Sequence, residues 1–153
     1  MTDQAYMALA LEEARKAYKK KEVPIGAVIV KDDVVIARGH NLRESNQQVS
    51  HHAEMIAIEN ACHKLSSWRL DGCTMFITSE PCSMCSGAII QSRISRVVYG
   101  TEDPKNGAHV SKVHLFDIPF NHIVDIQGHV MQDEARKLLK DFFNTLRNPK
   151  NDV

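Results

Sequence analysis

The sequence predicts an α/β fold in which helices cover both faces of a mixed five-stranded sheet, giving three α/β/α layers. Two apolar runs, 25–30 and 34–39, are joined by a short polar turn, which is typical of an antiparallel hairpin. After this hairpin, strand-like apolar runs alternate with helical segments, as they do in parallel crossover units. We therefore expect both strand orientations in one sheet and a single domain over residues 1–153.

The amino-terminal half contains a helix, the hairpin and a second helix. Asp3 is expected to cap the first helix, which ends in a lysine-rich stretch before Pro24. Apolar residues recur there at steps of three and four, as on one buried face: Tyr6, Met7, Leu9, Ala10, Ala14 and Ala17. A loop over 40–50 follows the hairpin, and the second helix is expected over 52–65.

The carboxy-terminal half alternates strands and helices. Strands are predicted over 73–79, 95–100 and 122–128, and helices over 82–94 and 132–148. Pro81 precedes the first of these helices, where a helix start tolerates proline. Residues 101–111 are expected to form a loop, and no element is assigned from there to Phe120.

The composition limits which partners the protein is expected to bind and where in the cell it is expected to be. The chain has 19 Lys and Arg and 19 Asp and Glu, so any nucleic acid would have to be held by a local basic patch. Apolar runs are too short to span a membrane, and the acidic, amphipathic start does not resemble a signal peptide. We therefore expect a cytoplasmic protein with no membrane partner.

Three residues indicate a metal site. Cys82 and Cys85 lie three residues apart at a predicted helix start, on one helical face, where the helix dipole stabilises thiolates. His52 also lies at a predicted helix start. If both helix starts meet, these residues supply three ligands and leave the fourth position of a zinc ion for water, as in catalytic sites. Two buried thiols and an unrelated surface histidine are the simpler alternative.

Glu54 follows His52 by two residues, which places it near such a metal without requiring it as a ligand. A carboxylate there can accept a proton from water activated by zinc and pass it to a leaving group. This pair of functions suits hydrolytic removal of ammonia from a ring carbon. The alternative is a glutamate that only favours the helix dipole.

The order His52-Ala53-Glu54, then Pro81-Cys82-Ser83-Met84-Cys85, matches the H-x-E and P-C-x-x-C signature of zinc nucleobase deaminases. Together with "EVPIGAVIV", "HAEMIAI", "WRLDGCTMFIT", "EPCSMCSGAI", "SRISRVVYG" and "DPKNGA", the chain resembles bacterial tRNA-specific adenosine deaminases of the zinc-dependent cytidine/deoxycytidylate deaminase-like superfamily. The resemblance implies a cytidine deaminase-like fold, one Zn²⁺ per chain, a homodimer, and conversion of the wobble adenosine of a tRNA anticodon stem-loop to inosine.

The resemblance also implies substrate contacts outside the metal site. These are Asn41 for the flipped purine, backbone groups of Ile25 and Pro81 for the pocket, Asp103 and Lys105 for flanking nucleotides, and Phe142 and Phe143 for the RNA groove. Residue chemistry alone offers other functions for some of them. Asn41 suits a loop cap, Asp103 suits a turn, and one of the two adjacent phenylalanines is expected to pack in the core.

Four features depart from the family pattern, all in the expected RNA-binding region. His51, the pair His109-Val110 and Ile123 stand where the family usually has other residue types, and the tail over 144–153 is less basic than is common in the family. His51 is therefore interpreted as a residue of the pocket edge or surface. The alternative function is deamination of a free nucleobase or nucleoside of the guanine, adenosine or cytidine type. A structural zinc subunit is the third hypothesis, although it gives Glu54 no function.

Overall fold

The protein is described by a computed structural model over residues 1–148, and within these residues a sheet of five strands runs in the order β2-β1-β3-β4-β5. β1 pairs antiparallel with β2 and β3, whereas β3–β4 and β4–β5 are parallel, so the sheet is mixed as predicted. The last five residues of the domain expected over 1–153 lie outside the described part.

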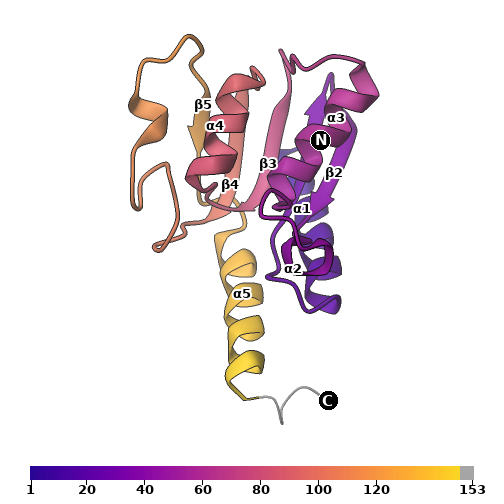
Figure 1. Cartoon of the computed structure of the whole chain (residues 1–153), viewed down its shortest axis with the longest axis vertical. Helices are drawn as coiled ribbons and strands as arrows, with labels where there is room; N and C mark the ends of the chain where they lie inside the picture. The colour runs from indigo at the N-terminus through magenta and orange to yellow at the C-terminus, as the bar shows by residue number, and fades with distance from the viewer. Residues whose placement is uncertain (149–153) are drawn as a thin grey trace.

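The elements follow the expected order along the chain (Figure 1). They are α1 Asp3–Lys19, β1 Gly26–Lys31, β2 Val34–His40, α2 Arg43–Asn46, α3 Ala53–Leu65, β3 Thr74–Ser79, α4 Ser83–Gln91, β4 Arg96–Thr101, the 3₁₀ helix η1 Leu115–Asp117, β5 Asp125–Gln127 and α5 Gln132–Arg147.

Alternating side chains of the strands form two cores, which makes the α/β/α layering. On one face, residues such as Ile29, Met75 and Ile77 pack with α3 and α4. On the other face, Val28 and Phe76 pack with α1, and α5 contacts β4 at one end. β1, β3 and β4 are therefore buried along nearly their whole length, because both of their faces are covered, whereas the edge strands β2 and β5 keep exposed residues.

The β3-α4-β4 unit determines where chemistry can occur. β3 and β4 are parallel neighbours, and three residues separate the end of β3 from the start of α4. The carboxyl ends of these strands and the start of α4 therefore lie at one edge of the sheet, from which α5 extends away (Figure 1). Ligand sites of open α/β sheets usually lie at this edge.

Several sequence expectations need correction. Thr2, not Asp3, caps α1, since the Thr2 hydroxyl accepts a hydrogen bond from the Ala5 amide at 3.1 Å. The expected loop 40–50 contains the short helix α2, and η1 lies in the stretch that had no assignment. The helix expected over 82–94 ends at Gln91, and the strand expected over 122–128 retains only Asp125–Gln127. Local propensity does not register these limits, because packing against neighbouring elements determines them.

Gly39 explains how closely α3 approaches the sheet. A side chain at this position of β2 would meet the backbone of Ala53 and Ala57 in α3. Only a glycine therefore lets α3, which follows His52, lie flat against β2. Among residues 1–148, no helix combines the length and apolar character needed to cross a bilayer.

Candidate metal and catalytic site

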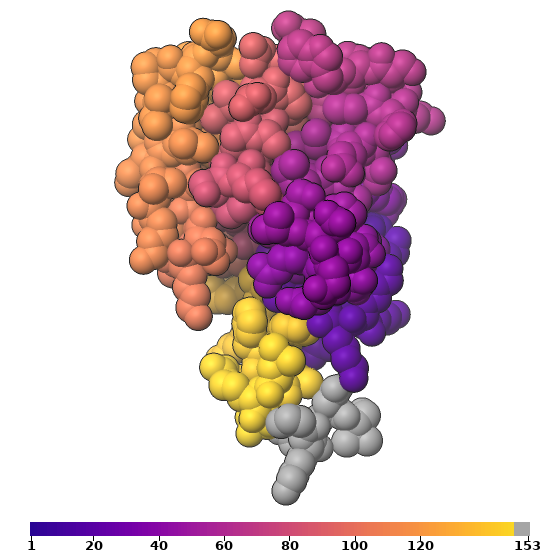
Figure 2. Space-filling view, viewed as in Figure 1, coloured from indigo at the N-terminus to yellow at the C-terminus, as the bar shows by residue number. Residues whose placement is uncertain are grey.

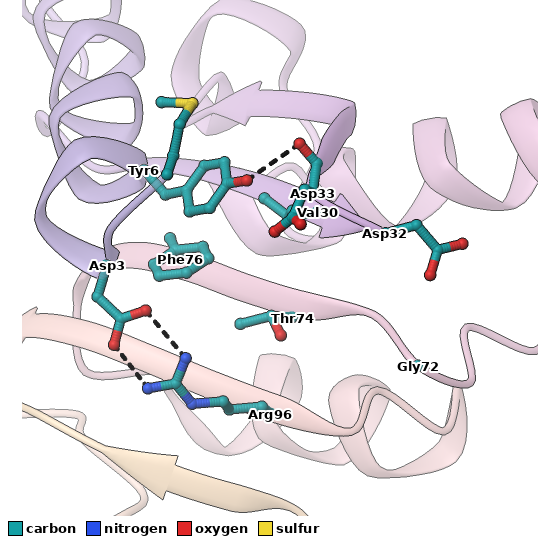
Figure 3. Close-up of a pocket in the computed structure, with 10 residues that line it drawn as sticks. Asp3, Tyr6, Val30, Asp32, Asp33, Gly72, Thr74, Phe76 and Arg96 are labelled. Atoms are coloured by element: carbon teal, nitrogen blue, oxygen red, sulfur yellow. Dashed lines mark hydrogen bonds and ion pairs between the residues drawn. The ribbon is translucent and has the colours of Figure 1, made fainter.

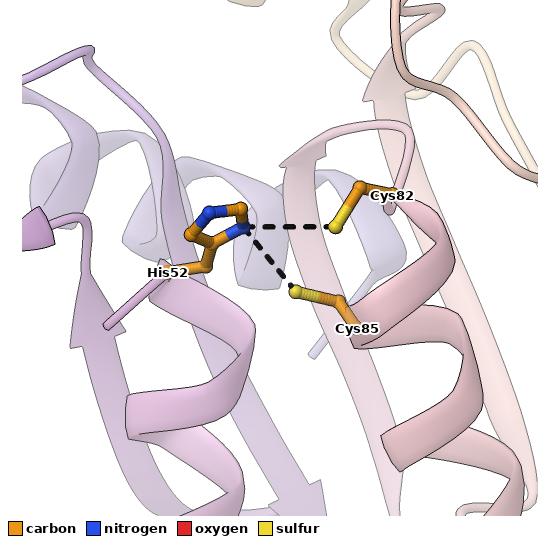
Figure 4. Close-up of side chains that lie close together, drawn as sticks. All are labelled: His52, Cys82 and Cys85. Carbon is orange, nitrogen blue, oxygen red and sulfur yellow. Dashed lines mark hydrogen bonds between the residues drawn. The ribbon is translucent and has the colours of Figure 1, made fainter. Parts of the chain in front are cut away.

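His52 ends the loop that returns from β2 and is the N-cap of α3. Its backbone is extended, with φ −75° and ψ 155°, so the imidazole leaves the helix axis instead of continuing the first turn. Figure 4 shows the ring pointing across to the start of α4. The orientation follows from the cap position, because the N-cap residue has non-helical dihedral angles.

Cys82 and Cys85 occupy the equivalent place on α4. Cys82 is the N-cap and Cys85 lies in the first turn, so both sulfurs face His52. The Nδ1 atom of His52 lies 3.7 Å from Sγ of Cys82 and 3.6 Å from Sγ of Cys85. All three ligand atoms lie within 4.8 Å of one another, and in the described part of the chain they form the one group of this kind.

This donor set fits a tetrahedral metal ion. Zinc bonds of about 2.0–2.3 Å at tetrahedral angles place nitrogen and sulfur ligands roughly 3.5 Å apart. The observed separations of 3.6 and 3.7 Å agree with that spacing. One imidazole and two thiols can therefore hold a metal, and three protein ligands leave a coordination position for another group.

The two thiols differ in their titration. A hydrogen bond from Cys85 lowers the pKa of Cys82 to about 4, and the hydrogen bond to His52 acts in the same direction. The interaction with Cys82 raises the pKa of Cys85 in turn. Binding a divalent cation would hold both sulfurs as thiolates.

Glu54 lies in the first turn of α3, two residues after His52. It is only 4% exposed, and burial raises its pKa to about 7. A carboxyl group with a pKa near neutrality can both accept and donate a proton during a reaction. The structure thus places a buried carboxyl group, with a pKa near neutrality, beside the ligand residues His52 and Cys85.

The residues predicted to line a substrate pocket have internal partners. Asn41 accepts a hydrogen bond from the Arg43 amide at 3.1 Å through its side-chain oxygen and donates to the Val23 carbonyl at 3.3 Å. These bonds match the loop-cap alternative. The carbonyl of Ile25 accepts from the Asn41 amide, and the carbonyl of Pro81 accepts from the Ala108 amide.

The loop after β4 reaches the metal-binding segment. The amide of Ala108 bonds to Pro81, and Gly107 forms an isolated antiparallel bridge with Cys82. Asp103 accepts hydrogen bonds from the amides of Lys105 and Asn106, so it builds the turn that its sequence suggested. Lys105 is exposed.

Two buried glutamates near the site were absent from the sequence expectations. Glu80 accepts hydrogen bonds from the loop after β4, and Glu22 accepts hydrogen bonds from the amides of Glu44 and Ser45 in α2. The one signal for Glu80 is a charged residue at the end of an otherwise apolar strand. Sequence alone cannot distinguish it from a surface residue.

The remaining histidines of interest lie beside the two loops. Nδ1 of His51 accepts a hydrogen bond from the side-chain amide of Asn46 at 2.9 Å, so His51 belongs to the edge formed by α2. Nδ1 of His109 lies 2.8 Å from the hydroxyl of Tyr99, and burial lowers the pKa of His109. The structure therefore brings neither histidine into the ligand group.

The two phenylalanines of α5 have separate environments. Phe142 is 6% exposed and packs edge-on against Tyr18 of α1, with ring centroids 5.7 Å apart. Phe143 is 42% exposed. Phe142 thus attaches α5 to α1, whereas Phe143 is accessible at the surface.

A separate pocket of about 280 Å³ lies at the opposite edge, beside the starts of β3 and β4 (Figure 3). There Arg96 donates two hydrogen bonds to Asp3, at 3.0 and 2.6 Å. The Tyr6 hydroxyl donates to the Asp33 carbonyl. These polar groups are hydrogen-bonded in pairs, and we propose no function for this pocket.

Comparison with known proteins agrees with this site. The MafB19-like deaminase family model matches residues 1–147. The tRNA-specific adenosine deaminase of Bacillus subtilis is 46% identical over 97% of this chain and 92% of its own length, and that of Aquifex aeolicus is 42% identical over 97% and 98%. A solved tRNA:A34 deaminase, studied for A-to-I editing at the wobble position, superposes with a TM-score of 0.85 at 43% identity, covering 88% of this chain and 98% of that one.

The ligand group predicts which substitutions release the metal. Purified Cys85→Ala protein should lose at least nine-tenths of its bound transition metal, because two ligands hold a divalent ion far more weakly than three. Elemental analysis after dialysis against a mild chelator measures the metal per chain. Cys73→Ala, which alters a buried cysteine outside the group, is the matched control and should keep the wild-type metal content. Equal metal in the two variants would contradict the assignment.

Proposed function

This chain belongs to the MafB19-like deaminases and to the family of tRNA-specific adenosine deaminases, and from this premise we propose that it converts the wobble adenosine of a tRNA anticodon loop to inosine. The reaction adds water at C6 of adenine and releases ammonia. The convergence of His52, Cys82 and Cys85 beside buried Glu54 is the observation that carries the proposal. One domain provides all four residues.

Zinc fits the three ligands, and when bound it supplies a Lewis acid that makes hydroxide available near neutral pH. Glu54 takes up the proton that the attacking water loses and delivers it to the departing amino group. Its burial excludes bulk water from this transfer, and its pKa of about 7 suits both directions. The target base must leave its stack, which costs least in an anticodon loop.

The residues around the ligands are proposed to hold the RNA. Asn41 and the backbone at Ile25 and Pro81 would surround the flipped purine. Asp103 and Lys105 would meet the flanking nucleotides, since their loop lies against the segment that contains Cys82. α5 extends past this edge of the sheet, as the space-filling view shows (Figure 2), and it contacts α1 and β4.

One face of α5 supplies the local basic patch that the neutral net charge requires. Arg136, Lys140, Phe143 and Arg147 recur at steps of three and four, are all exposed, and so share one helical face. We call this face the α5 stripe. Cations that meet phosphates, together with an aromatic ring that stacks on a base, are the usual means of holding single-stranded RNA.

A homodimer is proposed through the face formed by α3 and α4. A groove of about 640 Å³ there is lined by apolar side chains that include Ile58 and Met84, and Trp68 at its side is 60% exposed. η1 packs on α4, and Ile118 and Phe120 next to it are 47% and 46% exposed. A second copy is the occupant that the family resemblance implies, and a large apolar patch of this kind is typical of an interface.

The cytoplasm is the proposed location. tRNA is modified there, and none of the four cysteines forms a disulfide, as is usual in a reducing compartment.

The proposed proton transfer predicts the effect of removing Glu54. Glu54→Gln protein should keep its zinc, while inosine formation on an anticodon stem-loop with adenosine at the wobble position falls on the order of 10²–10⁴-fold. Nucleoside analysis by mass spectrometry measures inosine. Glu59→Gln, on an exposed position of the same helix, should retain wild-type activity.

The same assay includes free guanine, adenosine and cytidine as substrates. Turnover of a free base or nucleoside without inosine in the RNA would replace the proposed substrate. Wild-type inosine formation by Glu54→Gln would remove Glu54 from the mechanism.

The α5 stripe predicts a charge-specific effect on RNA binding. Lys140→Ala should weaken binding of the stem-loop and reduce the slope of log Kd against log salt concentration by about 1. Fluorescence anisotropy at several salt concentrations measures both. Lys64→Ala removes an exposed lysine from α3 and should leave the slope unchanged. If both variants gave the wild-type slope, the stripe would not be an RNA contact.

The dimer face predicts a change in assembly. Trp68→Glu should raise the dimer dissociation constant by roughly tenfold or more, because a buried charge would replace an aromatic anchor. Analytical ultracentrifugation over a concentration series measures this constant. Val34→Glu, at a residue 58% exposed on β2, is the matched control. A monomeric wild-type protein, or an unchanged constant for Trp68→Glu, would rule out this interface.

A further inference from the structure

Glu80 is a buried carboxylate that the proposed reaction does not use. It follows β3 directly and precedes Pro81 and the ligand Cys82. Its exposed fraction is 2%, which is costly for a charged side chain unless hydrogen bonds replace its lost water. The groups that satisfy it therefore indicate its function.

Every hydrogen bond to the Glu80 side chain that the structure describes comes from one loop, residues 103–111. Oε1 accepts the Asp103 amide at 3.0 Å and the hydroxyl of Ser111. Oε2 accepts the amides of His109 at 2.9 Å, Val110 at 3.0 Å and Ser111 at 3.2 Å. Hydrogen bonds to an ionised carboxylate are about twice as strong as neutral ones, so these fix both ends of the loop.

The backbone around Glu80 is joined to the same loop. The Ala108 amide bonds to the Pro81 carbonyl at 2.9 Å, and Gly107 bridges to Cys82. A side chain at Gly107 would collide with the carboxylate of Glu80. The carboxylate thus fills the space enclosed by residues 103–111, and glycine at 107 leaves room for it.

We propose that Glu80 is a positioning residue, which holds the loop 103–111 against the metal-binding segment so that Asp103 and Lys105 face the nucleotides next to the target base. The identity of the substrate in this proposal rests on the proposed function. Glu80 itself touches neither the substrate nor the metal. Losing its carboxylate should therefore weaken RNA binding through a mobile loop, while the ligands and Glu54 continue to work.

The variant Glu80→Gln tests this function. The NH2 group of the new side chain can only donate hydrogen bonds, and it would face backbone amides of the loop that also only donate. We expect a KM for the stem-loop RNA raised roughly tenfold or more, with kcat within about threefold of wild type and zinc retained. Glu13→Gln is the matched control, since Glu13 of α1 is 3% exposed and is paired with Lys16 of the same helix and with His40 of β2. A merely structural loss of stability would lower the melting temperature of both variants without separating KM from kcat.

Hydrogen exchange gives a readout that does not need activity. In Glu80→Gln, the amides of residues 103 and 109–111 should exchange at least roughly tenfold faster, while the amides of β1 keep their protection. Should Glu80→Gln fail to fold, Ser111→Ala removes the hydroxyl contact alone and should give the same pattern in smaller measure. Wild-type exchange in the loop, or a fall confined to kcat, would overturn the proposal. A wild-type protein that forms no inosine would instead overturn the proposed function.

A second variant tests whether the loop acts through this carboxylate. Gly107→Ala should raise KM as Glu80→Gln does, because the new methyl group displaces the carboxylate. In a Glu80→Ala background the new methyl group meets no carboxylate, so Gly107→Ala should raise KM by less than about a further twofold. If the two substitutions raised KM by independent factors that multiply, position 107 would not act through the Glu80 carboxylate and the proposal would be contradicted.

Discussion

The site depends on two helices that begin at the same edge of the sheet. His52 and Cys82 are both N-cap residues, so each is the last extended residue before a helix and directs its side chain away from the helix start. Gly39 allows α3 to lie against β2, and the parallel pair β3–β4 places the start of α4 beside it. Side chains thirty positions apart in sequence thus come within 3.7 Å of each other.

Glu54 and Glu80, two buried glutamates next to the ligand residues, show how surroundings change the pKa of the same type of side chain. Burial raises the pKa of Glu54 to about 7, which suits a group that exchanges protons. Glu80 is equally buried, and burial opposes its ionisation, but hydrogen bonds from Ser111 and the loop amides leave the pKa of Glu80 lowered. A carboxylate that stays ionised is suited to holding backbone amides in place. The same type of side chain is therefore suited to proton exchange in one environment and to holding backbone amides in the other.

The sequence predicted the parts of the structure that local patterns encode. Apolar strand runs, their alternation with helices, and the pairing of H-x-E with P-C-x-x-C were sufficient to predict the sheet, its layers and the ligand group. It missed α2 and the partners of Glu80, because those depend on contacts between distant segments, such as the bonds from the Glu44 and Ser45 amides to Glu22. It placed the cap of α1 one residue late, at Asp3 and not at Thr2, because both residue types can cap a helix. Asn41 shows the same limit, since its type suits both a loop cap and a substrate contact, and in the structure it bonds to Arg43 and Val23.

The central claim is that one imidazole and two sulfurs hold a single zinc ion with one position left for a small oxygen ligand near Glu54. X-ray absorption at the zinc edge of the purified protein tests it most directly. The account predicts two sulfur neighbours at about 2.3 Å and two nitrogen or oxygen neighbours at about 2.0–2.1 Å, of which one is an imidazole. A shell of four protein ligands, or one with fewer than two sulfurs, would contradict it.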